Sequence, residues 1–278
     1  MNRGGADNLR SVFVAGIGVW GPRLPGWAVA RSVIRGETAA PDGPAQRPAP
    51  AMLPPTERRR APDTVAVALE VAVQAIQMSG VDPTACASVF ASAYGDLAIN
   101  DYLCETLRDT PTLVSPTRFH NSVHNAAAGY WSIGTGSMQP YTAVAAYTET
   151  FAAGLLESLV QAAAGESPVL YVAYDVEARG PLAAQNRSRS LLGLALLVTP
   201  DRTAQSVARL GWRMQTEDVP PATAPSARVA VLAGENPMTS GLPLFESLAA
   251  ESSGRVILAT NGGPALELQI EPCRVQIA

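Results

Sequence analysis

The chain has 278 residues, enough for one large domain or two small ones. Hydrophobic residues make up 47% of it and charged residues 16%, against a charged share of roughly 25% in an average soluble domain. We therefore expect a large core. The net charge of −4 excludes the basic surface that binds nucleic acids or anionic lipids.

Three cysteines, Cys86, Cys104 and Cys273, form no CxxC pair and no disulfide framework. A low, odd count is typical of a reducing compartment. Met1–Arg10 is polar and contains no apolar signal core, and no apolar run approaches the roughly 20 residues of a membrane span. These features predict a cytoplasmic protein without a membrane span.

The first part of the chain predicts one strand and two helices. Ser11–Gly18, rich in valine and phenylalanine and ending in glycines, is typical of a buried strand. Trp27–Arg35 predicts a short helix, and the proline-rich residues 41–62 predict a loop. Asp63–Met78 is the strongest predicted helix, because its first residue can cap it and Gly80 ends it.

Strands and helices then alternate along the chain. The predicted elements are strand Ala87–Ala93, helix Asp101–Arg108, a helix within Thr117–Ile133, strand Tyr141–Ala146, helix Thr150–Ala164, and strands Pro168–Tyr174 and Leu191–Val198. This alternation predicts an α/β fold with a mostly parallel sheet covered on both faces. After Pro200 the pattern weakens to a linker, Val219–Ser226, and a hairpin of Arg255–Thr260 with Leu266–Glu271. We expect one domain over residues 10–278, with a loosely defined extension from about residue 200.

The segment from Gly16 to Gly21 matches the G-x-G-x-x-G dinucleotide fingerprint directly after a strand. Pro22 and Pro25 interrupt the helix that should face a pyrophosphate. No second strand with an acidic end follows about 20 residues later. We favour a glycine-rich strand end and expect no cofactor.

Two further patterns allow either a binding site or an ordinary structural role. His120 and His124 have the i, i+4 spacing of metal ligands, but no third ligand is apparent. We expect no metal and favour hydrogen-bonded histidines that give polar support. Arg58-Arg59-Arg60 could grip a phosphate, for instance on the prosthetic arm of a carrier protein, but a solvated charge run is favoured.

Tyr141–Gly154 predicts a strand that turns sharply into an alanine-rich helix. Several folds present a nucleophile at such a turn, where the helix N-terminus lowers a thiol pKa or holds an oxyanion. Here the turn offers Tyr147, Thr148, Glu149 and Thr150, and none is a cysteine. Threonine is a poor nucleophile without a base beside it. We favour a structural turn in which Thr148 or Thr150 caps the helix.

Several segments resemble, in order, the β-ketoacyl synthases. They read VFVAGIGVWGP, LPPTERRRAPDTVAVALEVAVQAI, SVFASAYGD and SPTRFHNSVHNAAAGYWSI. The last is similar to a short ketoacyl synthase-like N-terminal family that includes chain-length-factor subunits of aryl-polyene and related type II polyketide systems. The resemblance covers about residues 10–200 well and the tail loosely. It implies a thiolase-like half, with five strands in the order 3-2-1-4-5, the last antiparallel, and dimerisation through Tyr141–Ala146.

Two departures from the family bear on activity. Thr148 stands at the position where the family has its nucleophilic cysteine. The family also has two catalytic histidines well downstream of that cysteine, whereas this chain has no histidine after His124. Decarboxylative condensation needs that thiolate and those donors. The resemblance therefore implies a non-catalytic chain-length factor that pairs with a full-length β-ketoacyl synthase. It would shape the tunnel for an acyl chain carried by an acyl carrier protein, in polyketide, aryl-polyene or fatty-acid-like synthesis.

We expect this tunnel to be lined at the turn by Tyr147, Thr148, Glu149, Thr150 and Phe151. Phe151 would form part of its floor, so that Phe151→Ala should lengthen the product or blur the product distribution. The alternative is an enzyme, a divergent acyltransferase, thioesterase or decarboxylase that uses Thr148 with His120 or His124. A third possibility is a homodimeric structural remnant that binds no ketosynthase.

Overall fold

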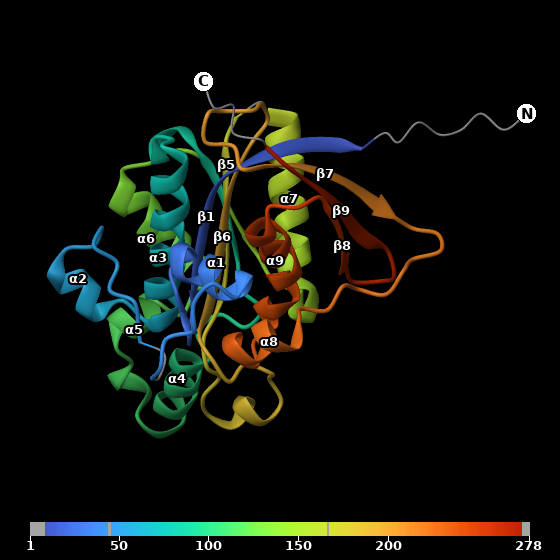
Figure 1. Cartoon of the computed structure of the whole chain (residues 1–278). Coiled ribbons are helices and arrows are strands. Elements are labelled where there is room, and N and C mark those ends of the chain that lie inside the picture. Colours follow the sequence, from blue (N-terminus) through green and yellow to red (C-terminus); the bar gives the residue numbers. More distant parts are fainter. Residues whose placement is uncertain (1–8, 44–45, 166, 274–278) are drawn as a thin grey trace, which may run out of the picture.

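The computed structural model describes residues 9–43, 46–165 and 167–273, so the predicted absence of a signal segment falls almost entirely outside it. Helices cover both faces of one large sheet (Figure 1). The strands are β1 Arg10–Gly21, β2 Leu24–Pro25, β3 Ala87–Ala91, β4 Tyr141–Val144, β5 Val169–Asp175, β6 Leu192–Thr199, β7 Ala208–Gln215, β8 Gly254–Ala259 and β9 Ala265–Pro272. The helices are α1 Trp27–Arg35, α2 Pro55–Arg60, α3 Asp63–Ser79, α4 Leu97–Asp109, α5 Pro116–His120, α6 Ala126–Thr135, α7 Thr150–Gly165, α8 Ala227–Ala233 and α9 Leu242–Ala250.

The strand order within the described residues is β4-β3-β5-β6-β1-β7-β9-β8, with β2 paired to β1. β4 and β5 flank β3 in parallel, and the other ladders are antiparallel. The predicted α/β class is confirmed, and so is the antiparallel direction of the fifth predicted strand, β6.

The predicted order 3-2-1-4-5 is wrong. The same five strands lie in the order 3-2-4-5-1, because β5 pairs with β3 while β6 pairs with both β5 and β1. β1 is long enough to pair with β6 along most of its length and with β7 along its first residues. The residues after Pro200 therefore extend the sheet with β7, β9 and β8, and the predicted hairpin of β8 and β9 is confirmed.

The predicted helix bounds agree best with the structure where a glycine ends the helix. α1 has the predicted bounds, and α3 is one residue longer than predicted, with Gly80 in the left-handed conformation after it. Asp63 does not cap α3; its carboxylate lies 2.7 Å from Arg47 Nε instead. The predicted loop contains α2, where Pro55 stands in the first turn and its missing N–H costs nothing.

Two glycines of β1 allow the backbone of α3 to lie directly on the strand. A Cβ on Gly16 would lie 2.0 Å from the carbonyl oxygen of Ala75, and one on Gly18 would lie 2.0 Å from that of Val71. No residue with a side chain fits such an approach. The glycine pattern therefore allows α3 to pack closely on β1 and does not form a phosphate-binding turn. Gly16 and Gly18 also lie within the strand, not at its end as predicted.

The core forms two layers, one on each face of the sheet. α3 and α6 pack on one face, and α7, α1 and α9 pack on the other (Figure 1). α3 is buried on nearly every side because α6 and neighbouring segments cover its outer surface. No helix among the described residues is long and apolar enough to cross a membrane.

The close approach of α3 to β1 makes a stability prediction. Gly18→Ala should lower the free energy of unfolding by about 1–3 kcal/mol, because the added Cβ forces the backbones apart. Guanidinium unfolding measures the change. Gly129→Ala in α6 is the control: its Cβ would meet no heavy atom within 4 Å, so stability should hold or rise by up to about 1 kcal/mol. A fully stable Gly18→Ala variant would contradict the described packing.

Candidate active site at the elbow and groove beside the edge strand

The predicted sharp turn lies between β4 and α7. After Val144 the chain passes through a short 3-10 turn, Tyr147–Glu149, and enters α7 at Thr150. Tyr147 has a φ of 54°, one of three positive values at non-glycine positions in the described chain. This backbone costs a residue with a side chain about 1–2 kcal/mol. A strained residue between a strand and a helix is the geometry of a nucleophile elbow, and the strain falls one residue before Thr148.

Thr150 holds this elbow from inside. Its buried hydroxyl accepts a hydrogen bond from Ala146 N at 2.8 Å and donates one to Tyr147 O at 2.7 Å. Asn261, in the turn between β8 and β9, donates its side-chain amide to Ala146 O at 3.4 Å. Thr150 therefore stabilises the turn but does not cap α7 as predicted, because it is the first residue of the helix and the N–H that it binds precedes the helix. The tail after Pro200 also helps to fix the turn.

Thr148 is exposed, and its hydroxyl donates to the Glu149 carboxylate at 2.6 Å. His124 Nε2 lies 2.8 Å from Ser92 O and must donate, because a carbonyl oxygen can only accept. His120 packs edge-on against Tyr130 instead. No hydrogen bond joins either imidazole to Thr148 within residues 9–43, 46–165 and 167–273.

The two histidines do not share a helix face, so the metal-ligand arrangement that their spacing allowed does not form. The favoured hydrogen-bonded role fits His124 but not His120, which is exposed. His120 is the last residue of α5, while His124 lies in the turn before α6. The single helix predicted within Thr117–Ile133 is broken here. Among the described residues, no group of three or more histidine, cysteine or acidic side chains could hold a metal ion.

Phe151 belongs to the core, not to an open wall at the elbow. It is fully buried, with its ring 5.4 Å from that of Tyr171 and 6.4 Å from that of Phe245, centroid to centroid. Gly241 makes room for it, since a Cβ there would lie 2.3 Å from the Phe151 ring. Removing this ring would leave a core cavity costing about 3–5 kcal/mol, so a product change in Phe151→Ala cannot isolate a tunnel effect.

A small cavity of about 160 Å³ lies between the elbow and the tail. Thr148 and Glu149 line it on one side, and Thr223, Ser240 and Ala259 line it on the other. Ligand pockets usually enclose about 300–1,000 Å³. The tail therefore closes this side of the elbow to an extended acyl chain.

A buried carboxylate lies at the same edge of the sheet. Asp175 ends β5 and accepts hydrogen bonds from Ser92 Oγ at 2.8 Å, Ala93 N at 2.8 Å and Tyr94 N at 3.3 Å. Burial raises its pKa to about 7, although these hydrogen bonds act in the opposite direction. Asp175 is not among the residues predicted from the sequence, although an acidic residue directly after an apolar strand is a signal for such a site.

The Asp175 network reaches the elbow through Tyr94, whose ring lies edge-on to that of Tyr147 at 5.8 Å. On its other side, Asn236 donates its side-chain amide to Asp175 O at 3.1 Å. The ends of β3 and β5 and the tail are thus tied together behind the elbow.

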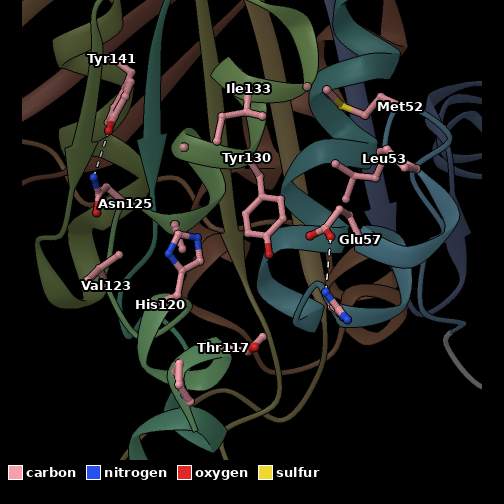
Figure 2. A pocket seen from close by; sticks show the side chains of 16 residues that line it. Met52, Leu53, Glu57, Thr117, His120, Val123, Asn125, Tyr130, Ile133 and Tyr141 are labelled. Carbon is pink, nitrogen blue, oxygen red and sulfur yellow. Dashed lines mark hydrogen bonds and ion pairs between the residues drawn. The ribbon is translucent and has the colours of Figure 1, made fainter.

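An apolar groove of about 810 Å³ lies beside β4, and we call it the α6 groove (Figure 2). Ile133, Tyr130 and Met52 point into it from α6 and from the loop before α2 (Figure 2). Its side chains at the β4 end are Asn125 and Tyr141, joined by a hydrogen bond of 3.1 Å. Ile133 is 82% exposed, an unusual state for a large aliphatic residue.

The two edges of the sheet differ in their protection. At the β8 edge, Thr223 covers the backbone of Ile257, accepting from its N–H at 2.9 Å and donating to its carbonyl at 2.8 Å. At the other edge, β4 pairs with β3 alone within the described chain, and its sequence Tyr-Thr-Ala-Val has no charge. Natural proteins usually protect an edge with charge, proline or a cover. The β4 edge is therefore suited to pairing with another chain.

The raised pKa of Asp175 makes stability depend on pH. The folded state holds this proton up to about pH 7, whereas an unfolded aspartate releases it near pH 3.9. The stability that protonated Asp175 contributes is therefore fully present below about pH 4, and it is lost as the pH rises through about 7. Denaturant unfolding should show that the free energy of unfolding falls between pH 4 and pH 8. This fall should be shallower in the Asp175→Asn variant. Parallel curves for the two proteins would show that Asp175 titrates normally.

Comparison with known proteins places these features in a family. Residues 33–257 match the family described as β-ketoacyl synthase, N-terminal domain. No curated protein matches the chain.

Three solved structures share the fold at low sequence identity. A chain of the ketosynthase ApeO in complex with its chain length factor ApeC, from Xenorhabdus doucetiae, is 19% identical with a TM-score of 0.69, covering 93% of this chain and 99% of that one. The ishigamide ketosynthase/chain length factor is 15% identical with a TM-score of 0.67, covering 95% and 100%.

The third is AntDE:AntF, a type II polyketide acyl-carrier protein in complex with its ketosynthase bound to the hexaketide. It is 10% identical with a TM-score of 0.71, covering 95% and 100%. The resemblance found in the sequence is confirmed: this chain belongs to the β-ketoacyl synthase N-terminal domain family.

Proposed function

We propose that this chain is a non-catalytic subunit that pairs through β4 with a complete β-ketoacyl synthase and forms one wall of its acyl tunnel. The observation that carries the proposal is the open, uncharged β4 edge, which runs directly into an elbow without a thiol. An unprotected edge strand pairs readily with a strand of another chain.

The residues at the elbow do not supply the chemistry of a condensing enzyme. The cysteine that precedes β3, Cys86, lies at the opposite end of the parallel strands, and burial raises its pKa to about 12. Thr148 is hydrogen-bonded to a carboxylate rather than to an imidazole. A threonine nucleophile needs an activating base, and a carboxylate is a weaker base than an imidazole. We therefore favour the non-catalytic role over the acyltransferase, thioesterase or decarboxylase alternative.

The α6 groove supports a role in holding an acyl chain. Its volume of about 810 Å³ lies in the usual range of ligand sites. Val123 and Ile133 present exposed apolar side chains there, at 49% and 82% exposure. Because Tyr141 of β4 also borders the groove, a partner strand on β4 would pass beside its opening. We place the tunnel wall here, because the cavity at Thr148 and Glu149 is too small.

The compared structures include a ketosynthase with its chain length factor and a ketosynthase with its acyl-carrier protein. For this chain we propose the same two kinds of partner, a full-length synthase and an acyl carrier protein with its acyl chain. Synthesis of a polyketide, an aryl polyene or a fatty-acid-like product stays a prediction, as does the cytoplasmic location. Tyr147, Thr148, Glu149 and Thr150 remain proposed elbow residues of this subunit.

The test is co-expression with a candidate synthase, tagging only this chain, followed by affinity capture and sizing. We expect a one-to-one complex. Ala143→Lys places a charge on the exposed β4 edge and should abolish it, because the ammonium group opposes strand pairing. Ala163→Lys, on the exposed surface of α7, adds the same charge away from the edge and should leave capture unchanged.

Two outcomes would overturn this assignment. A stable homodimer that captures none of the candidate synthases would favour the structural-remnant alternative. A complex that survives Ala143→Lys but fails in Ala163→Lys would place the interface on another face. Circular dichroism of both variants confirms that they are folded.

A further inference from the structure

The turn between β8 and β9 contains the sequence Asn261-Gly262-Gly263, the one place in the chain where glycine follows asparagine. All three residues are exposed. Gly262 and Gly263 have φ values of 93° and 109°, and a Cβ on either would meet no heavy atom within 4 Å. The turn is therefore uncrowded, and its backbone has the conformational freedom that glycine provides.

An exposed asparagine before glycine can react with its own backbone. The nitrogen of Gly262 attacks Cγ of Asn261, and the new C–N bond closes a cyclic succinimide. The Cγ–Nδ2 bond breaks, and the amide proton of Gly262 leaves with this nitrogen as ammonia. Water then opens either C–N bond of the ring and gives aspartate or isoaspartate. Water is the only co-reactant, and a neutral amide becomes a carboxylate in both products.

The fold leaves this attack unobstructed. Among the described residues, the Gly262 N–H makes no hydrogen bond, so none has to break before the nitrogen reacts. The side chain of Asn261 is held in the described chain by a single long hydrogen bond, 3.4 Å from its amide to Ala146 O. Glycine also has no side chain that could shield Cγ from the attacking nitrogen.

The other asparagines of the described chain are less suited to the reaction. Asn236 precedes Pro237, whose nitrogen carries no proton to lose. Asn121 is buried, and Asn100 lies within α4, where helical hydrogen bonds fix its backbone. A residue with a side chain follows each of the rest. Asn261 is therefore distinguished by both its sequence and its surroundings.

The product loses the contact with the elbow. The Asn261 amide and the Glu149 N–H donate to the same oxygen, Ala146 O, at 3.4 and 3.1 Å. An ionised carboxylate can only accept hydrogen bonds, so it cannot bind a carbonyl oxygen. At neutral pH the new group is ionised, and its charge would face that partly negative oxygen. Isoaspartate also lengthens the backbone of the turn by a methylene group.

We propose that Asn261 is a site of spontaneous deamidation and that this reaction releases the β8–β9 turn from the elbow. Ala259 ends β8, and it lines the small cavity at the elbow together with Thr148 and Glu149. Movement of the turn away from Ala146 would open this cavity. The reaction needs neither a synthase nor a carrier protein, so the inference does not rest on the proposed function.

Peptide mapping by mass spectrometry of the folded chain, incubated in mildly alkaline buffer, tests the reaction. The peptide with Asn261 should gain about 1 Da, because –OH replaces –NH2. It should convert at least about tenfold faster than the peptide with Asn186, because the side chain of Arg187 hinders closure of the ring. An isoaspartate-specific methyltransferase should label the product. The control Asn261→Gln keeps an amide but must close a larger ring, so it should stay unmodified.

Hydrogen exchange of the elbow peptide, residues 145–150, tests the release. The variant Asn261→Asp has the carboxylate of the aspartate product, whereas Asn261→Gln keeps an amide donor. The elbow amides should exchange at least about threefold faster in Asn261→Asp than in Asn261→Gln, because the turn no longer holds the elbow. The amides of α3, which has no part in this contact, should exchange equally in both.

Three outcomes would overturn the inference. If Asn261 stays intact in the folded chain while a free peptide of the same turn converts, the fold protects the residue. If Asn261 and Asn186 convert at the same rate, the turn does not favour the reaction. If Asn261→Asp and Asn261→Gln show equal exchange at the elbow, the modification does not release the turn.

Discussion

Two carbonyl oxygens of α3 lie against two glycines of β1 with no side chain between them. This close contact sets the helix low on the sheet, over β1 and its neighbour β6, where Gly193 makes room for Val67 and Val71. α6 packs beside α3 on the same face of the sheet, against β3 and β4, and the α6 groove opens along α6. A bulkier residue at Gly16 or Gly18 would lift the whole layer and with it the groove.

The common direction of β4, β3, β5 and β1 brings the chemically distinctive residues to one edge of the sheet. Tyr147 follows β4, Ser92 follows β3 and Asp175 ends β5. Their contacts make a rigid, partly buried support that would position a nucleophile in an active enzyme. Here the support is intact but carries a tyrosine and a threonine, in line with the non-catalytic role proposed above.

Local sequence signals predicted much of this fold. The left-handed glycines Gly36 and Gly80 end α1 and α3 as predicted, and the small residues before Tyr147 marked the elbow. The strand order was not predictable in this way, because β6 and β7 meet β1 across nearly 200 residues of sequence. α9 was missed because its sequence, LPLFESLAA, is short and nearly uniformly apolar, without helical periodicity.

Side-chain roles at the site were harder to predict than its location. Phe151 is three residues from the exposed Thr148, yet helix geometry turns it into the core against Gly241. The spacing of His120 and His124 indicated one helix, but the chain breaks between them.

The central claim is that this chain assists condensation without forming an acyl-enzyme. Intact-mass analysis of its complex with a synthase, after incubation with an acyl thioester, tests this most directly. We expect the added acyl mass on the synthase subunit alone, with this chain unmodified. An acyl group on this chain that disappears in Thr148→Val would contradict the account and establish the elbow as a catalytic site.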